Sequence, residues 1–250
     1  MKEFECKRNN SILRGYIDVP NKKLITDIII LLHGFGADYG RTAGSLMADC
    51  AKDLGRAGYC SIRFDFYGCG KSDGAFKQMT LSSQLSDVVA VVQMTRSLYP
   101  MAKITLLGFS EGGLIASLAA PMLKVDKLIL LAPAISILAE INRGRLLGTA
   151  FDTDCLPDTL YVNRIDRIIG KAFIQECINC DIRQISKYLG PVLYCQSLHD
   201  EYVPQEVEKS YQKFYSGRMD VVRVNTSNHI FTGHERKTML GKVIDFISRK

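Results

Sequence analysis

The chain has 250 residues, 47% of them hydrophobic, and a formal net charge of +6 from 32 basic and 26 acidic side chains. This length can bury a large core, and we expect a single domain that spans residues 1–250. The basic residues are interleaved with acidic ones and form no block with aromatic residues between them, which argues against nucleic-acid binding.

The start of the chain lacks the apolar segment of a signal peptide, and no apolar run is long enough to cross a bilayer. We therefore expect a soluble, cytoplasmic protein without a membrane partner. Eight scattered cysteines favour reduced thiols over a disulfide framework. Cys177 and Cys180 form a lone CxxC without a histidine at zinc spacing, so we expect no metal site.

An opening hairpin is predicted from residues 4–7 and 13–19, which flank Asn9 and Asn10. Apolar runs typical of strands buried on both faces follow at 25–32, 60–66, 104–107, 127–131 and 191–196. Between them lie helical patterns. Thr80 can cap one such helix, whose apolar face would carry Leu81, Leu85, Val88, Val89 and Val92. This alternation predicts an α/β fold with a mostly parallel, twisted sheet and helices on both faces.

Residues 134–184 interrupt the alternation with short helical pieces, an irregular loop at 152–158 and no clear buried strand. This stretch is too long for an ordinary connection. Functional groups gather at the carboxyl ends of parallel strands, so an insertion at that edge would lie over the site. We interpret the stretch as a cap that shapes a pocket; a peripheral decoration is the alternative.

Gly108-Phe109-Ser110-Glu111-Gly112 stands where a strand-like run ends and a helix-like run begins. This placement predicts a nucleophile elbow with Ser110 as the nucleophile. A side chain at Gly108 or Gly112 would collide with the neighbouring strand or helix at so sharp a turn.

The base that would activate Ser110 is sought among four histidines: His33, His199, His229 and His234. If the chain order is nucleophile, acid, histidine, then His33 is excluded because it precedes Ser110. His229 lies in a loop just past the strand-like run 221–224. We prefer it to His234, the second choice, which lies where the final helix begins.

Asp200 is the candidate acid, because it follows the strand-like run 191–196 at a carboxyl edge, where it could orient an imidazole. The oxyanion hole needs two N–H donors. We expect one from Glu111 and the other from Phe35, in the loop His33-Gly34-Phe35-Gly36. The glycines of this loop, Gly34 included, would let the backbone approach the substrate.

Glu111 places a carboxyl group next to the nucleophile, and two interpretations stay open. The side chain lies in the first turn of a helix, where the dipole favours an acid, and points away from the oxyanion. Alternatively, its charge repels anionic acyl groups.

Three further segments carry a resemblance to a known family: RFDFYGCGKSDG (63–74), LLAPA (130–134) and DEYVP (200–204). With the elbow and the HGFG loop, they make the chain similar to the α/β-hydrolase superfamily. Within it, the chain resembles the bacterial cinnamoyl and feruloyl esterases over most of its length. The resemblance implies hydrolysis of hydroxycinnamate esters by a triad of Ser110, His229 and Asp200, without a cofactor.

The chain departs from that family at several positions. Members commonly have His-Ser-Gln at the elbow and Gly-His-Gly where residues 68–70 read Gly-Cys-Gly. An acid and a tyrosine in the family's cap bind the phenolic hydroxyl groups. The matching positions are Glu140 and Phe173, so the acid is kept and the tyrosine hydroxyl is absent. Phe173 could still pack on an aromatic acyl group.

The sequence thus predicts a serine esterase that acts on a small hydroxycinnamate or similar aryl ester through an acyl-enzyme. A thioesterase or a serine peptidase would use the same residues. A non-catalytic ligand-binding protein of the same fold is a further alternative. A dehalogenase is disfavoured, because that reaction needs an aspartate in place of Ser110. The number of subunits stays open, with a homodimer as one alternative.

Overall fold

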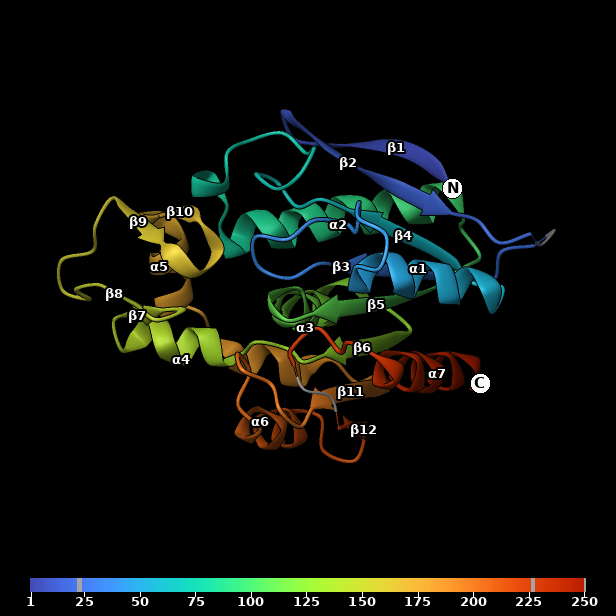
Figure 1. Ribbon diagram of the computed structural model, residues 1–250. Coiled ribbons are helices and arrows are strands. Elements are labelled where there is room, and N and C mark those ends of the chain that lie inside the picture. The colour runs from blue at the N-terminus through green and yellow to red at the C-terminus, as the bar shows by residue number, and fades with distance from the viewer. Residues whose placement is uncertain (22–23, 226–227, 250) are drawn as a thin grey trace.

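An eight-stranded sheet in the order β1-β2-β4-β3-β5-β6-β11-β12 forms the centre of the computed structural model, which describes residues 1–21, 24–225 and 228–249 (Figure 1). The strands β1 and β2 are antiparallel, as are β2 and β4, and all other neighbours are parallel. The strands are β1 (Lys2–Arg8), β2 (Ser11–Asp18), β3 (Asp27–Leu32), β4 (Cys60–Phe64), β5 (Lys103–Phe109), β6 (Lys127–Leu131), β11 (Val192–Ser197) and β12 (Met219–Val224). The predicted mostly parallel sheet is confirmed.

The opening hairpin is also confirmed. Arg8 pairs with Ser11 across the turn, where Asn9 takes the left-handed conformation with φ 52°. Asparagine tolerates this conformation better than most residues do.

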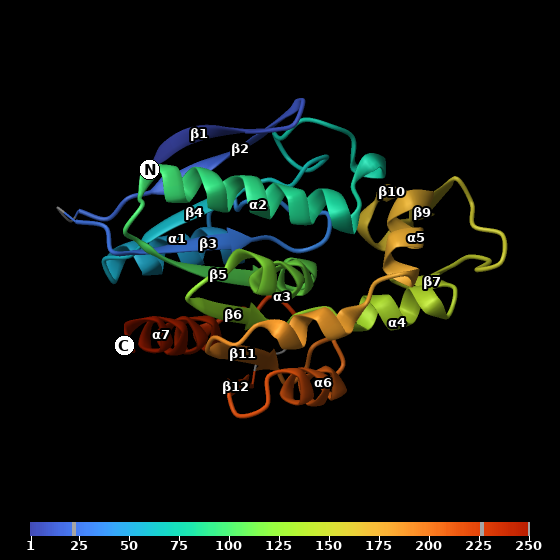
Figure 2. The same ribbon diagram turned by 180° about the vertical axis from the view of Figure 1, so that it is seen from behind.

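Helices cover both faces of the sheet (Figures 1 and 2). Successive side chains of a strand point to opposite faces. Accordingly Ile28 and Ile30 of β3 belong to the apolar cluster that contains residues of α2, α3 and α6, whereas Ile29 belongs to the cluster that contains residues of α1 and α7. These helices are α1 (Leu46–Arg56), α2 (Leu81–Leu98), α3 (Glu111–Leu123), α6 (Glu206–Phe214) and α7 (His234–Ser248).

Helix α2 begins at the predicted cap. The Thr80 hydroxyl accepts a hydrogen bond from the N–H of Ser83 at 3.1 Å. The buried face of α2 differs from the predicted apolar stripe, since it includes Gln84 and Asp87. Asp87 is tolerated there because Arg8 of β1 reaches it at 2.8 Å.

The segment 134–184 lies between β6 and β11 and projects to one side of the sheet, where it is coloured yellow-green to yellow in Figure 1. Instead of helical pieces alone, it contains two small antiparallel sheets, β7 with β8 and β9 with β10. Their strands are too short to show a clear periodic pattern in sequence. The elements are α4 (Ser136–Asn142), β7 (Arg145–Leu146), β8 (Thr149–Ala150), β9 (Thr159–Val162), η2 (Asn163–Ile165), β10 (Arg167–Gly170), α5 (Lys171–Ile178) and η3 (Ile182–Lys187); the short turn η1 (Phe76–Gln78) precedes α2.

All eight cysteines lie in the described part of the chain and are free. No helix within the described ranges combines the length and the apolar character that spanning a bilayer requires.

Candidate active site

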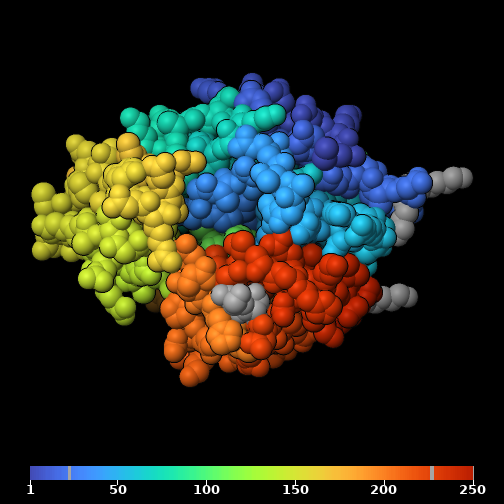
Figure 3. Space-filling model, viewed as in Figure 1, coloured from blue at the N-terminus to red at the C-terminus, as the bar shows by residue number. Residues whose placement is uncertain are grey.

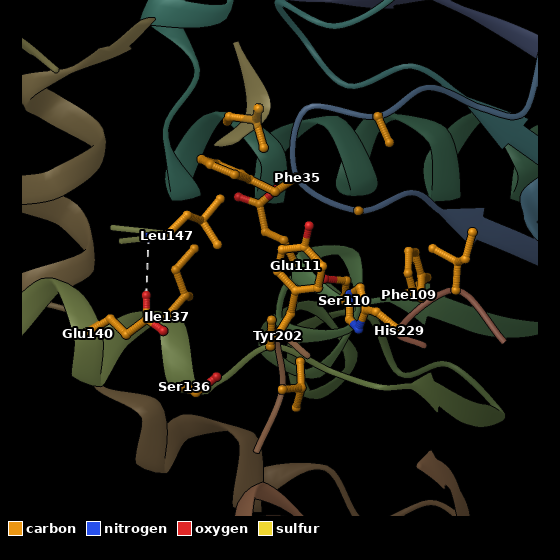
Figure 4. Close-up of a pocket in the computed structure, with 16 residues that line it drawn as sticks. Phe35, Phe109, Ser110, Glu111, Ser136, Ile137, Glu140, Leu147, Tyr202 and His229 are labelled. Carbon is orange, nitrogen blue, oxygen red and sulfur yellow. Dashed lines mark hydrogen bonds between the residues drawn. The ribbon is translucent and has the colours of Figure 1, made fainter. Parts of the chain in front are cut away.

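A cavity of about 250 Å³ opens at the carboxyl ends of β3, β5, β6 and β11. Figure 3 shows a depression between the yellow inserted segment, the blue N-terminal part and the orange C-terminal part. The lining residues are Gly34, Phe35, Ala37, Phe109, Ser110, Glu111, Ala134, Ser136, Ile137, Glu140, Leu147, Ile165, Tyr202, Val203, His229 and Ile230 (Figure 4). Ser110 and His229, which are far apart in sequence, thus face one cavity.

Ser110 occupies a strained turn between β5 and α3, with φ 55° and ψ −121°. A conformation of this kind costs about 1–3 kcal/mol and persists only where the surrounding structure enforces it. A Cβ atom on Gly108 would lie 2.2 Å from the carbonyl oxygen of Gly112, and one on Gly112 would lie 2.4 Å from that of His33. The two glycines therefore permit the turn that presents Ser110 to the cavity.

Asp200 and His229 form a short hydrogen bond, with 2.7 Å between Oδ2 of Asp200 and Nδ1 of His229. The other carboxylate oxygen of Asp200 accepts the N–H groups of Tyr202 and Val203, both at 2.8 Å. Because an ionised carboxylate only accepts hydrogen bonds, Nδ1 of His229 must carry the proton. Its Nε2 atom is then left as a proton acceptor.

The loop of His229 is held from both sides. The N–H of His229 donates to Glu201 Oε2 at 2.8 Å, and the rings of Phe109 and Tyr202 lie with their centroids 4.7 and 5.1 Å from the imidazole. These contacts restrict the orientation of the ring. Two other residues of the loop, Thr226 and Ser227, lie outside the described residues.

The other two histidines that follow Ser110 lie elsewhere. His199 is exposed, and its Nε2 atom contacts Asn225 at 3.1 Å. His234 is the first residue of α7 and is also exposed.

His33 has a supporting place that the sequence did not reveal. Its Nε2 atom accepts the N–H of Phe66 at 3.1 Å, so Nδ1 carries the proton and donates to the carbonyl oxygen of Gly34 at 2.8 Å. Burial lowers the pKa of His33, which keeps the ring neutral. The imidazole thereby links the loop after β3 to the segment that follows β4. In the sequence, the position of His33 directly before Gly34 was the one signal that could have indicated this role.

Two N–H groups beside Ser110 are available to a ligand. Phe35 donates its N–H to no acceptor in the described ranges of the chain. Glu111 is the first residue of α3, and the first N–H groups of a helix have no intrahelical acceptor. Gly34 packs against the elbow, because a Cβ atom placed on it would lie 3.2 Å from Cβ of Ser110.

The Glu111 side chain is almost fully buried, with 1% of its surface exposed. Burial raises the pKa of this carboxyl group to about 8. A hydrogen bond with the Gln84 side chain lowers the pKa, but this effect is the weaker of the two. The carboxyl group is therefore mostly neutral at pH 7. Repulsion of anionic acyl groups would require a charge that this environment disfavours, whereas the other interpretation agrees with Figure 4, where the side chain runs away from Ser110.

The two residues predicted from the inserted segment have different positions. Glu140 of α4 lines the cavity, and its Oε2 atom accepts the N–H of Leu147 at 3.2 Å. Phe173 of α5 is fully buried and is not among the described lining residues. Its ring lies 5.3 Å from that of Phe35, so it supports the wall from behind.

Known proteins resemble this chain in sequence and in fold. The family described as serine aminopeptidase, S33, matches residues 25–167. Est1E from Butyrivibrio proteoclasticus, in a structure with ferulic acid bound, is 28% identical with a TM-score of 0.90, over 98% of this chain and 97% of that chain. A second Est1E structure is 25% identical with a TM-score of 0.88, over 99% and 98%. Mouse α/β hydrolase domain-containing protein 10 shares the fold at 20% identity and a TM-score of 0.76, over 99% and 98%. A search of curated proteins found no match.

Proposed function

Because the chain belongs to the serine aminopeptidase, S33, family and is a serine hydrolase of the α/β-hydrolase fold, we propose that it hydrolyses carboxylic esters through an acyl-enzyme. The observation that carries this proposal is the hydrogen bond between His229 and Asp200 at the cavity that Ser110 faces. A serine hydroxyl is a weak nucleophile and needs a base that a third group orients.

In this proposal the Ser110 hydroxyl attacks the ester carbonyl while Nε2 of His229 accepts its proton. The imidazolium then donates that proton to the departing alcohol, which leaves an acyl group on Ser110. A water molecule, deprotonated by His229, releases the acid and restores the serine. Asp200 holds the tautomer of His229 and stabilises the imidazolium.

The negative charge that forms on the carbonyl oxygen would be stabilised by the N–H groups of Phe35 and Glu111. Donors held in place before the reaction stabilise this charge more effectively than water does. His33 would act as a positioning residue here, because its bond to Gly34 holds the backbone next to Phe35.

The acyl group that we propose is a hydroxycinnamate or a similar aryl acid. Aromatic and aliphatic side chains, among them Phe35 and Ile137, make up most of the lining, which suits a flat apolar group. The similar Est1E was solved with ferulic acid bound. Residues 134–184 would serve as the cap, and Glu140 would face the polar end of the acyl group.

Parallel assays of the purified protein test this proposal. Feruloyl, short-acyl and long-acyl p-nitrophenyl esters, a thioester and an aminoacyl p-nitroanilide would be compared. We expect the feruloyl ester to have the highest kcat/KM. Ser110→Ala should lose activity by several orders of magnitude, whereas the control Ser86→Ala, on an exposed part of α2, should retain it.

Other outcomes would identify the rival functions. Fastest cleavage of the anilide would favour a peptidase, and fastest cleavage of the thioester a thioesterase. Turnover that survives in Ser110→Ala would contradict the mechanism. An inactive protein that a fluorophosphonate does not label would indicate a non-catalytic binding protein.

A further inference from the structure

The side chain of Arg236, in the first turn of α7, is buried next to the loop that carries His229. Arg236 is 8% exposed, and all three nitrogen atoms of its guanidinium group donate hydrogen bonds to other parts of the chain. Charged side chains are seldom buried unless they are paired and hydrogen-bonded. A buried guanidinium group with this many acceptors fixes the segments that it contacts.

Two of these hydrogen bonds go to the backbone directly after His229. The Nε atom of Arg236 donates to the carbonyl oxygen of Phe231 at 3.0 Å, and Nη2 donates to that of Ile230, also at 3.0 Å. The N–H and the ring of His229 are bound by the loop that follows β11. Arg236 therefore holds the backbone on the opposite, carboxyl-terminal side of the imidazole.

The backbone that Arg236 holds is strained. Phe231 has φ 52°, in the left-handed region that a bulky residue rarely adopts. Its side chain is fully buried in the apolar cluster that contains residues of α1 and α7. A conformation of this kind persists only where the surrounding structure enforces it. The buried ring and the hydrogen bond from Arg236 together provide that restraint.

The remaining nitrogen atom, Nη1 of Arg236, connects this loop to a distant part of the chain. It donates to Oδ2 of Asp49 in α1 at 2.7 Å and to the carbonyl oxygen of Gly44 at 2.6 Å. Helices α1 and α7 contact each other on one face of the sheet (Figures 1 and 3). Because the donors of a guanidinium group point in fixed directions, Arg236 sets the position of the two loop carbonyls relative to α1.

We propose that Arg236 is a positioning residue for His229, and that its hydrogen bonds to the following backbone keep Nε2 of the imidazole directed at Ser110. The side chain of Arg236 is not among the described residues that line the cavity, so it acts through His229 and not on the substrate. The inference rests on the proposed ester hydrolysis. A misplacement of about 1 Å can slow such a reaction by about 100-fold, and substrate binding need not change with it.

The conservative variant Arg236→Lys tests this inference. Lysine keeps the positive charge beside Asp49 but lacks the planar donors that reach both carbonyls of the loop. Active sites would be counted by fluorophosphonate labelling. We expect kcat per active site to fall by about tenfold while KM stays within about twofold of the wild-type value. Lys237→Met removes a neighbouring, exposed cation of α7 and should retain the wild-type kcat.

Chemical rescue separates positioning from a purely structural role. A cavity of about 550 Å³ that Gly44, Asp49 and Arg236 help to line gives small ions access to this place. We expect Arg236→Ala to lose about 100-fold in kcat. Guanidinium at about 20 mM, far below the concentrations that unfold proteins, should restore at least about tenfold of that loss. Methylammonium at the same concentration lacks the planar donors and should restore none.

Proton NMR provides a measurement that does not depend on turnover. The proton on Nδ1 of His229 lies in a short hydrogen bond to Asp200, so its resonance should appear at low field. We expect this resonance to shift upfield or broaden in Arg236→Lys and to stay unchanged in Lys237→Met.

Three results would overturn the inference. They are a folded Arg236→Lys protein with the wild-type kcat per active site, an unchanged Nδ1 proton resonance in that protein, and an Arg236→Ala protein whose kcat guanidinium does not raise. Wild-type ester hydrolysis together with any of these refutes this inference alone. A wild-type protein that hydrolyses no ester refutes the proposed function, and the NMR comparison then still tests whether Arg236 positions His229.

Discussion

Oδ2 of Asp200 lies 2.7 Å from Nδ1 of His229, although the two residues belong to loops that follow different strands, β11 and β12. These strands are parallel neighbours, so their carboxyl ends open at the same edge of the sheet. The contact thus follows from the topology.

Asp200→Asn should lower kcat by about 10⁴-fold with little loss of stability. The amide can present an N–H to the imidazole, which favours the wrong tautomer of His229. Steady-state kinetics on the preferred ester measure the effect. Glu201→Gln, which alters a contact to the backbone of His229, is the matched control and should cost tenfold or less. Equal losses in the two variants would contradict the assigned tautomer.

Gly108→Ala should lower the free energy of unfolding by about 3 kcal/mol, because the added Cβ atom would lie 2.2 Å from the backbone of Gly112. Gly55→Ala is the matched control. A Cβ atom there meets nothing within 4 Å in the helix α1, and the change should stabilise the protein by about 0.5–1 kcal/mol. Urea unfolding followed by circular dichroism compares the two. A Gly108→Ala protein as stable as the wild type would show that the elbow is less crowded than described.

His33→Phe should lower the free energy of unfolding by about 3 kcal/mol. It leaves the buried N–H of Phe66 unpaired and removes one of the two hydrogen bonds that the carbonyl of Gly34 accepts, the other coming from the N–H of Ala37. His234→Phe, at an exposed helix start, should change it by less than about 0.5 kcal/mol. The gap between wild type and His33→Phe should narrow as the pH falls below 6.5. The reason is that the unfolded histidine then binds a proton that the folded one, with its lowered pKa, does not. A gap independent of pH from 5 to 8 would contradict a neutral His33.

Glu111→Gln should become more stable relative to the wild type as the pH rises from 5 to 8. Burial raises the pKa of the folded carboxyl from 4.5 to about 8, so over this interval the folded wild-type protein binds a proton that the unfolded chain has released. Wild-type stability then falls by up to about 1.4 kcal/mol per pH unit through this group, and the amide removes that loss. Urea midpoints of the two proteins at both pH values provide the test. A constant difference would show that Glu111 ionises normally.

The core strands could be predicted from sequence because each is a short apolar run between turn signals. The first expected residues of one run, Ile25 and Thr26, lie outside β3, since the parallel pairing with β5 begins at Asp27 and Lys103. The first paired residue of a strand depends on the neighbouring strand. The local sequence pattern holds no information about that neighbour.

The less predictable features depend on distant partners. Asp87 on the buried face of α2 became possible through Arg8, which is far away in sequence. Phe173 was expected at the substrate, but its buried ring packs behind that of Phe35. This position results from the packing of α5 against the loop after β3, which the sequence alone does not reveal. The neutral state of Glu111 likewise depends on burial that a single sequence does not reveal.

Trapping of the covalent intermediate tests the central claim most directly. The protein would be mixed with a slowly released p-nitrophenyl ester, quenched in acid, digested and analysed by mass spectrometry. We expect the acyl group on Ser110 in the wild type and in Asp200→Asn, and no acylated peptide in Ser110→Ala. An acyl group on any other residue, or hydrolysis without an acylated peptide in an active wild-type protein, would contradict the proposed mechanism.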